Sequence, residues 1–120
     1  MIMNYKFDYD EDCDILAIYH SPRKVKESLE VSENIILDLD KDEKINGIEI
    51  LDASEFFGSF NPEITIEFLS RLDSARIEQK SFRNQWILLV FLESNGKSFS
   101  QPMPPLRKTE FLSPILSPSN

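Results

Sequence analysis

The sequence predicts an α+β fold, in which an antiparallel β-meander sheet is covered by one helix, with an additional C-terminal β-hairpin and an extended tail. Three observations support this prediction. Short runs over residues 5–51 alternate apolar and polar side chains, as half-buried strands do. Apolar residues recur at helical spacing over 61–73. The dipeptide Asn95-Gly96 is a strong hairpin signal inside 82–101.

Five short strands are expected in the first half of the chain. The first run, 5–9, resumes at 15–19 after an acidic turn, so these two should form a hairpin. Three further runs follow across short polar turns, at 25–31, 35–39 and 45–51. Connections of roughly 2–6 residues are too short for parallel crossovers, so we expect strands that are neighbours in the sequence to pair antiparallel.

The remaining residues should provide the cover and the tail. The helix over 61–73 begins at an asparagine cap followed by proline, and we expect it to cover one face of the sheet. Prolines oppose strand pairing after residue 101, which predicts an extended or disordered tail over 102–120. A chain of 120 residues fits one α+β domain, which we place at 1–101.

Composition and charge argue against several functional classes. The net charge of −8 opposes nucleic-acid binding, which depends on Lys and Arg, and favours a basic protein partner. The longest apolar run, 86–92, is far shorter than the ~20 residues that span a bilayer. No signal-peptide pattern opens the sequence. The single cysteine, Cys13, has no internal disulfide partner, so we expect a cytoplasmic protein with a free thiol.

Three motifs in the first half resemble those of a widespread family of short bacterial proteins. They are Tyr9-Asp10-Glu11-Asp12-Cys13-Asp14-Ile15-Leu16-Ala17-Ile18, then Ile35-Ile36-Leu37-Asp38-Leu39-Asp40 after Glu30-Val31, and Gly47-Ile48-Glu49-Ile50-Leu51-Asp52-Ala53-Ser54. In this order over residues 5–55, they make the chain similar to the domain of unknown function 2283 family. The resemblance implies a small β-meander followed by a helix, and no known activity or catalytic residue. Genes for members of this family often lie next to genes for small toxin-like proteins, so the resemblance implies an antitoxin-like role.

Two acidic patterns are candidates for metal binding. The first is the alternating set Asp8, Asp10, Asp12 and Asp14, whose carboxylates an extended chain would direct to one side. A small metal-dependent hydrolase that uses these aspartates of residues 8–14 is the alternative function. The simpler interpretation is a charged hairpin turn whose aspartates bond to their own backbone.

The second acidic pattern matches part of a calcium-loop template. Asp38, Asp40, Asp42 and Glu49 stand at its positions 1, 3, 5 and 12, but Glu43 occupies the position that needs glycine. The flanks are also strand-like, whereas the template requires helices. We therefore expect no metal site here, and no cofactor.

No catalytic motif is recognisable, so we predict that the protein is not an enzyme. The only histidine, His20, lacks a nucleophile motif around it, and the glycines at 47, 58 and 96 cannot form a glycine-rich phosphate loop. Aspartates beside Cys13 should raise its thiol pKa and reduce its reactivity. Basic residues between Arg71 and Arg83 are interleaved with acidic ones, which indicates a salt-bridged helix surface.

The function we predict is that of a small acidic, non-enzymatic protein-interaction domain. The run 86–92 is apolar on both faces of a strand, which is more than five strands and one helix can cover. The second face should therefore be an interface, with a homodimer or a small basic protein as the partner. A more specific form of this prediction is an antitoxin-like protein that binds and masks a basic toxin. The predicted interface residues are Trp86, Leu88, Val90, Phe91 and Leu92.

Overall fold

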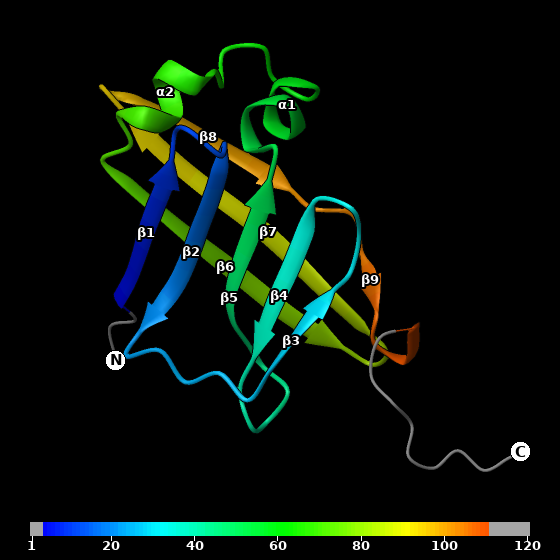
Figure 1. Ribbon diagram of the computed structural model, residues 1–120. Helices are drawn as coiled ribbons and strands as arrows, with labels where there is room; N and C mark the ends of the chain where they lie inside the picture. Colours follow the sequence, from blue (N-terminus) through cyan, green and yellow to red (C-terminus); the bar gives the residue numbers. More distant parts are fainter. Residues whose placement is uncertain (1–3, 111–120) are drawn as a thin grey trace, which may run out of the picture.

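The computed structural model describes residues 4–110 as two antiparallel β-sheets packed face to face (Figure 1). The prediction of an α+β fold with one covering helix is wrong. The chain is mostly β, and its two α-helices have six and five residues. A second sheet, and not a helix, covers the apolar face of the first. The segment from Arg71 to Arg83, which the sequence indicated as a helix surface, contains a strand of this second sheet.

Sheet A contains the five strands expected in the first half of the chain. They are β1 (Asn4–Asp10), β2 (Ile15–Ser21), β3 (Glu27–Glu30), β4 (Ile35–Leu39) and β5 (Ile45–Leu51). All pairs are antiparallel, but the order is β1-β2-β5-β4-β3, so the sheet is not a simple meander. The short, largely exposed β3 suits an edge, whereas β5 buries Ile48 and Ile50 and takes the centre.

Sheet B follows the helices and is formed by the second half of the chain. Its strands are β6 (Ser74–Phe82), β7 (Gln85–Ser94), β8 (Lys97–Pro102) and the short β9 (Leu106–Arg107). The predicted hairpin between β7 and β8 is confirmed, and its turn residues Asn95 and Gly96 both have positive φ. The sequence interpretation missed most of β6, which pairs with β7 over its whole length.

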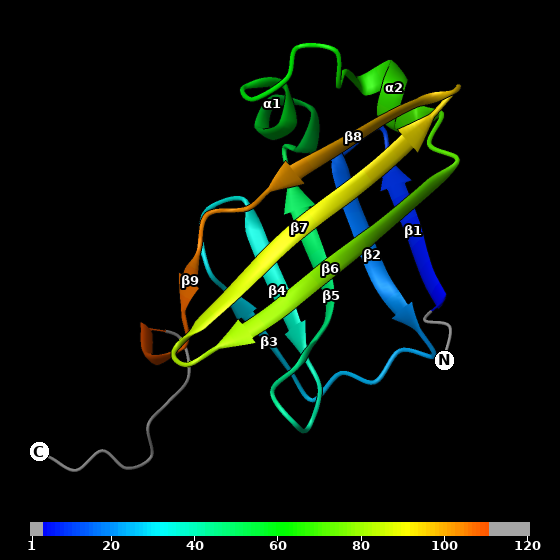
Figure 2. The same ribbon diagram turned by 180° about the vertical axis from the view of Figure 1, so that it is seen from behind.

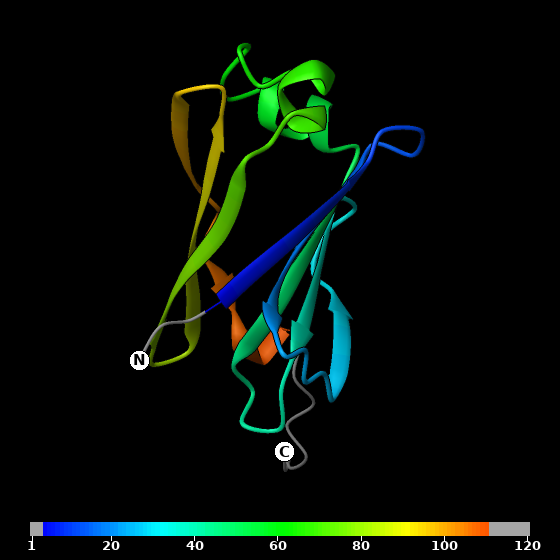
Figure 3. The same ribbon diagram turned by 90° about the vertical axis from the view of Figure 1, so that its left-hand side faces the viewer.

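The two helices close one end of the sandwich instead of covering a face (Figure 3). They are α1 (Ala53–Gly58) and α2 (Ile66–Ser70). The helix predicted over 61–73 is reduced to α2, which Thr65 caps by accepting a hydrogen bond from the backbone N–H of Phe68 at 3.1 Å. Phe57, Ile64 and Leu69 bury their side chains at this end of the core.

The core lies between the sheets, whose strands cross obliquely (Figures 1 and 2). Alternate residues of β7 face sheet A, and every one of them is at most 2% exposed. These inward residues are Trp86, Leu88, Val90 and Leu92. Gln79 of β6 also joins the sheets, because its side-chain amide donates to the carbonyl of Ile45 at 2.6 Å and accepts from its N–H at 3.0 Å.

The beginning of the predicted tail is part of the fold. Met103 is 4% exposed, and its backbone N–H donates to the carbonyl of Leu88 at 3.0 Å. Residues 106–107 then pair with β7 as β9, and a 3-10 helix spans Lys108–Glu110. The rest of the predicted tail, 111–120, lies outside the described residues. Within residues 4–110, no helix is long and apolar enough to cross a membrane.

Candidate functional site

The aspartates of the first acidic pattern do not converge, because Asp14 belongs to a structural cluster that we call the Asp14 lock (Tyr9, Asp14 and Ser54). The Tyr9 hydroxyl donates to Asp14 Oδ1 at 2.6 Å, and the Ser54 hydroxyl donates to Oδ2 at 2.7 Å. The backbone N–H of Ser54 also donates to Oδ1 at 3.0 Å. Asp52, at the N-cap of α1, makes no side-chain cap bond, so Asp14 caps this helix from the β1–β2 turn.

The other members of the two acidic patterns are held apart. Asp10 accepts a hydrogen bond from the N–H of Cys13, and Asp40 accepts from the N–H groups of Asp42 and Lys44 in the β4–β5 turn. Asp38 forms an ion pair with Arg23 on the outer face of sheet A. In the part of the chain that the structure describes, no three His, Cys, Asp or Glu side chains are grouped to hold a metal ion.

Burial, and then the hydrogen bond to the Asp14 carboxylate, raise the pKa of Tyr9 far above its usual value. The folded protein therefore keeps this phenol proton at pH values where the unfolded chain loses it. The raised pKa of Tyr9 stabilises the folded state fully below pH ~10, the pKa of a tyrosine in the unfolded chain. This contribution to the free energy of unfolding is lost as the pH rises above that value.

We expect the free energy of unfolding to fall as the pH rises above about 10, and to fall less in Tyr9→Phe. The substitution removes the titrating phenol but keeps the ring. Urea denaturation at a series of pH values measures this. Because burial also raises the pKa of Tyr5, part of the alkaline loss should remain in the variant. Equal pH slopes in both proteins would contradict the assignment.

Cys13 and His20 lie apart from each other, because Cys13 is in the β1–β2 turn and His20 is at the opposite end of β2. Among residues 4–110, the side chain of His20 forms no hydrogen bond or ion pair with an acidic or basic side chain. The charge of Asp10, and its hydrogen bonding, raise the pKa of the exposed Cys13 thiol, in the direction predicted from the sequence. His20, at the end of β2, packs edge-on against the ring of Tyr5 at a centroid distance of 4.6 Å. The remaining polar candidates are the lysines and aspartates of two loops of sheet A, the β2–β3 and β4–β5 connections.

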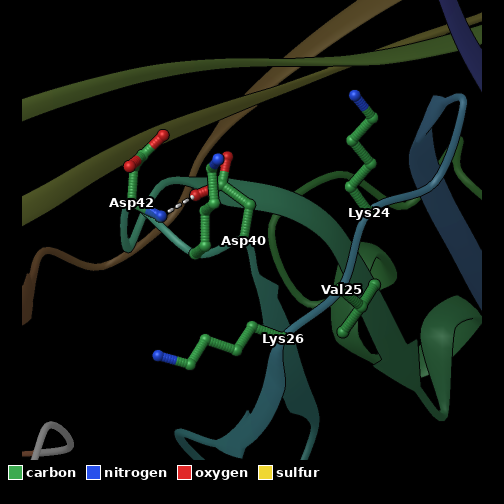
Figure 4. A pocket seen from close by; sticks show the side chains of 6 residues that line it. Lys24, Val25, Lys26, Asp40 and Asp42 are labelled. Atoms are coloured by element: carbon green, nitrogen blue, oxygen red, sulfur yellow. Dashed lines mark hydrogen bonds between the residues drawn. The ribbon is translucent and has the colours of Figure 1, made fainter.

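A pocket of about 470 Å³ lies between the β2–β3 and β4–β5 connections (Figure 4). The ammonium groups of Lys24 and Lys26 point away from each other, and the carboxylate of Asp40 already accepts turn N–H groups. The side chains that line it therefore do not converge on a common point. We assign no chemistry to this pocket.

The structure divides the predicted interface residues between two sides of β7. Trp86, Leu88, Val90 and Leu92 are buried in the chain's own core, so they are not available to a partner. Phe91 lies on the opposite, outer side, together with two residues that the sequence interpretation left out. These are Ile87, which is 40% exposed, and the half-buried Leu89.

No other described element covers the outer face of sheet B (Figure 2). On this face β7 presents an apolar strip, Ile87-Leu89-Phe91. Beside it is a groove of about 460 Å³, bordered by Pro102 and Pro105 on the β8 side. On the β6 side the charged outward residues alternate in sign, and they are Arg76, Glu78 and Lys80. The Arg76 guanidinium lies 3.9 Å from the centroid of the Phe91 ring, which leaves the strip bordered by both signs of charge.

These features define a mostly β protein with a hydrogen-bonded cluster, the Asp14 lock, that stabilises the fold, and an apolar strip on the outer face of sheet B. Residues 6–54 match the family model described as "Protein of unknown function (DUF2283)". The predicted resemblance is thus confirmed for this segment, which includes most of sheet A, Asp14 and Ser54. No solved structure gives a significant match to the chain.

Two curated relatives match part of the chain. One, from Methanosarcina mazei, is named "Putative hypoxanthine phosphoribosyltransferase" and is 44% identical over 52 residues, which are 43% of this chain and 42% of the relative. An uncharacterised protein of Methanocaldococcus jannaschii is 40% identical over 55 residues, 46% of this chain and 47% of the relative. The chain therefore spans less than half the length of these relatives. The family is one of unknown function.

Proposed function

We propose that the protein is a non-enzymatic protein-interaction domain that pairs with a second copy through the outer face of sheet B. The observation that carries this proposal is the strip Ile87-Leu89-Phe91. Its three side chains are outside the core cluster, on a face that no other described element covers. An apolar strip with a groove beside it is typical of a protein-binding surface.

The energetics of the strip favour association. Removing apolar surface from water contributes roughly 25 cal/mol per Å², and β7 presents three large side chains in a row. The charges on β6 alternate, so a second copy can place an acidic group opposite a basic one. A twofold dimer buries the same patch on both chains and is the commonest closed assembly.

We expect Ile87→Asp to weaken the homodimer at least about tenfold, because each interface would bury two carboxylates in place of apolar side chains, and the exposed Lys80 opposite each one offsets that cost only in part. Ile66→Asp is the matched control, since Ile66 is 43% exposed and lies in α2. Sedimentation equilibrium from about one to one hundred micromolar measures both. A wild-type protein that is monomeric over this range would overturn the homodimer, and so would equal weakening by the control.

A finer proposal is that the domain is antitoxin-like and masks a small basic protein in the cytoplasm. Its support is the net charge of −8 and the interaction surface. Co-purification with the product of a neighbouring gene that encodes a small basic protein tests it, with a charge-matched unrelated basic protein as the control. Binding of both to the same extent would count against a specific partner.

The enzymatic alternatives have less support. The hydrolase alternative needs converging aspartates, and Asp14 is instead bonded to Tyr9 and Ser54. The transferase name belongs to a relative of which only 42% is matched, so it is not extended to this chain.

A further inference from the structure

The outer face of sheet A is a second uncovered surface, and it is built differently from that of sheet B (Figure 1). One cross-strand row traverses all five strands. The strand pairing places its members side by side in the order Asp8, Ala17, Glu49, Ile36 and Glu30. Carboxylates thus stand at both ends and at the centre of the row, with apolar side chains between them.

Apolar residues in and beside this row are not used by the core. Ile15 and Leu51 are paired partners on β2 and β5, and Ile36 lies one strand further on. All three are half-buried, and none belongs to the core cluster or to the apolar side chains packed against it. They form a shallow apolar surface over the centre of the sheet.

Acidic side chains outnumber basic ones among the described residues of this face, on which Lys6 of β1 stands beside Asp8. Asp8, Glu49 and Glu30 have no ion-pair partner among residues 4–110. The nearby Asp38 is neutralised by Arg23, whose guanidinium also lies 4.8 Å from the centroid of the Tyr19 ring. The face therefore differs from that of sheet B, where basic and acidic residues alternate.

We propose that the outer face of sheet A binds a basic amphipathic helix of a partner protein, an inference that rests on the proposed function as an interaction domain. With strands ~4.8 Å apart, the row from Asp8 to Glu30 spans about 19 Å. A helix with its side chains is about 10–12 Å wide, so it covers the three central strands and leaves the two outer carboxylates at its flanks. Lysine stems can lie on the apolar surface while their ammonium groups reach Glu49.

The test is a titration of the full-length, isotope-labelled protein, followed by NMR, with a synthetic Leu-Lys-Ala helix about 18 residues long. The result we expect is a set of shift changes confined to the outer face of sheet A, centred on Ala17, Ile36 and Glu49. A Leu-Glu-Ala helix of the same pattern should produce none. Raising the salt concentration should weaken the binding, because both flanks are exposed to solvent.

Two variants separate this site from general attraction to an acidic protein. Glu49→Gln should weaken binding roughly fivefold, whereas Glu67→Gln, on α2, removes the same charge and should leave it unchanged. Ile36→Thr should also weaken binding roughly fivefold, with Ile66→Thr as its control. Equal weakening by a variant and its control would overturn the proposal.

The location of the shifts distinguishes the remaining outcomes. Changes centred on Ile87 and Leu89 would assign the peptide to sheet B and overturn the sheet A site. Concentration-dependent shifts on sheet A without peptide would make a second copy the occupant instead. Repeating the titration with the Ile87→Asp variant tests the sheet A site separately from the sheet B homodimer. Loss of the homodimer should leave the shift changes on sheet A unchanged.

Discussion

A chain carrying Val90→Asp is expected not to fold. Val90 is fully buried, is paired with Ile77 of β6 and faces the core between the two sheets. Placing a carboxylate there costs several kcal/mol, because no buried Lys or Arg among residues 4–110 can pair with it. That is a large part of the 5–15 kcal/mol that stabilises a typical domain. Loss of the circular dichroism of β-structure and of dispersed amide NMR signals measures the effect.

The adjacent position supplies the control. Leu89→Asp makes a similar change one residue earlier, where the half-buried side chain points to the outer, solvent-facing side of sheet B. This variant should keep its circular dichroism and lose only self-association. If Val90→Asp folded normally while Leu89→Asp did not, the assignment of inner and outer sides of β7 would be reversed.

The second large effect is expected from Asp14→Ala, which should lower the free energy of unfolding by about 3 kcal/mol. The substitution removes the acceptor for the Tyr9 hydroxyl and for both the hydroxyl and the N–H of Ser54. It also removes the cap of α1 and replaces a residue at positive φ, a conformation that alanine adopts less readily than aspartate. Urea denaturation of the wild type and the variant measures the difference.

Asp12→Ala is the matched control in the same turn. The Asp12 side chain is exposed and makes no hydrogen bond or ion pair with the described residues, so the change should stay within about 0.5 kcal/mol. Ser54→Ala should lie between the two, and its effect should largely disappear in the Asp14→Ala background because both act on the same bonds. Additive effects would indicate that Asp14 and Ser54 stabilise the fold separately.

The extent to which the sequence predicts this fold depends on how local the determining interactions are. The strands of sheet A and the turn at Asn95-Gly96 follow from side-chain alternation and turn chemistry, which act over a few residues. The pairing of β2 with β5 was not predictable in this way, because it depends on which strands bury most apolar surface. The apolar spacing from Ile64 to Leu72 also fits a helix, but the chain leaves it after Ser70 to begin β6.

The sequence predicted which strand carries the candidate interaction surface, but not which side of that strand faces outward. Residues 86–92 are apolar throughout, so the composition of the run does not distinguish Leu88 from Leu89. The register with β6 does so, because Leu88 shares the inner side with Gln79, which bonds to sheet A, whereas Leu89 is opposite Glu78. The alternation of Ala75 and Ile77 with charged residues in β6 was readable in the sequence, but the charges there suggested a helix surface.

The division of the sandwich into two uninterrupted stretches of chain has a consequence for how such proteins diverge. Sheet A ends at residue 51 and sheet B begins at residue 74, so no strand of one is inserted into the other. The family segment, 6–54, therefore corresponds to half a sandwich, with Leu16, Ile18 and Ile48 on its inner side. Exposure of that side to water is unfavourable, so we expect another protein that carries this segment to cover it with residues from outside the segment. Replacement of sheet B by another cover would leave the Asp14 lock and the outer face of sheet A in place.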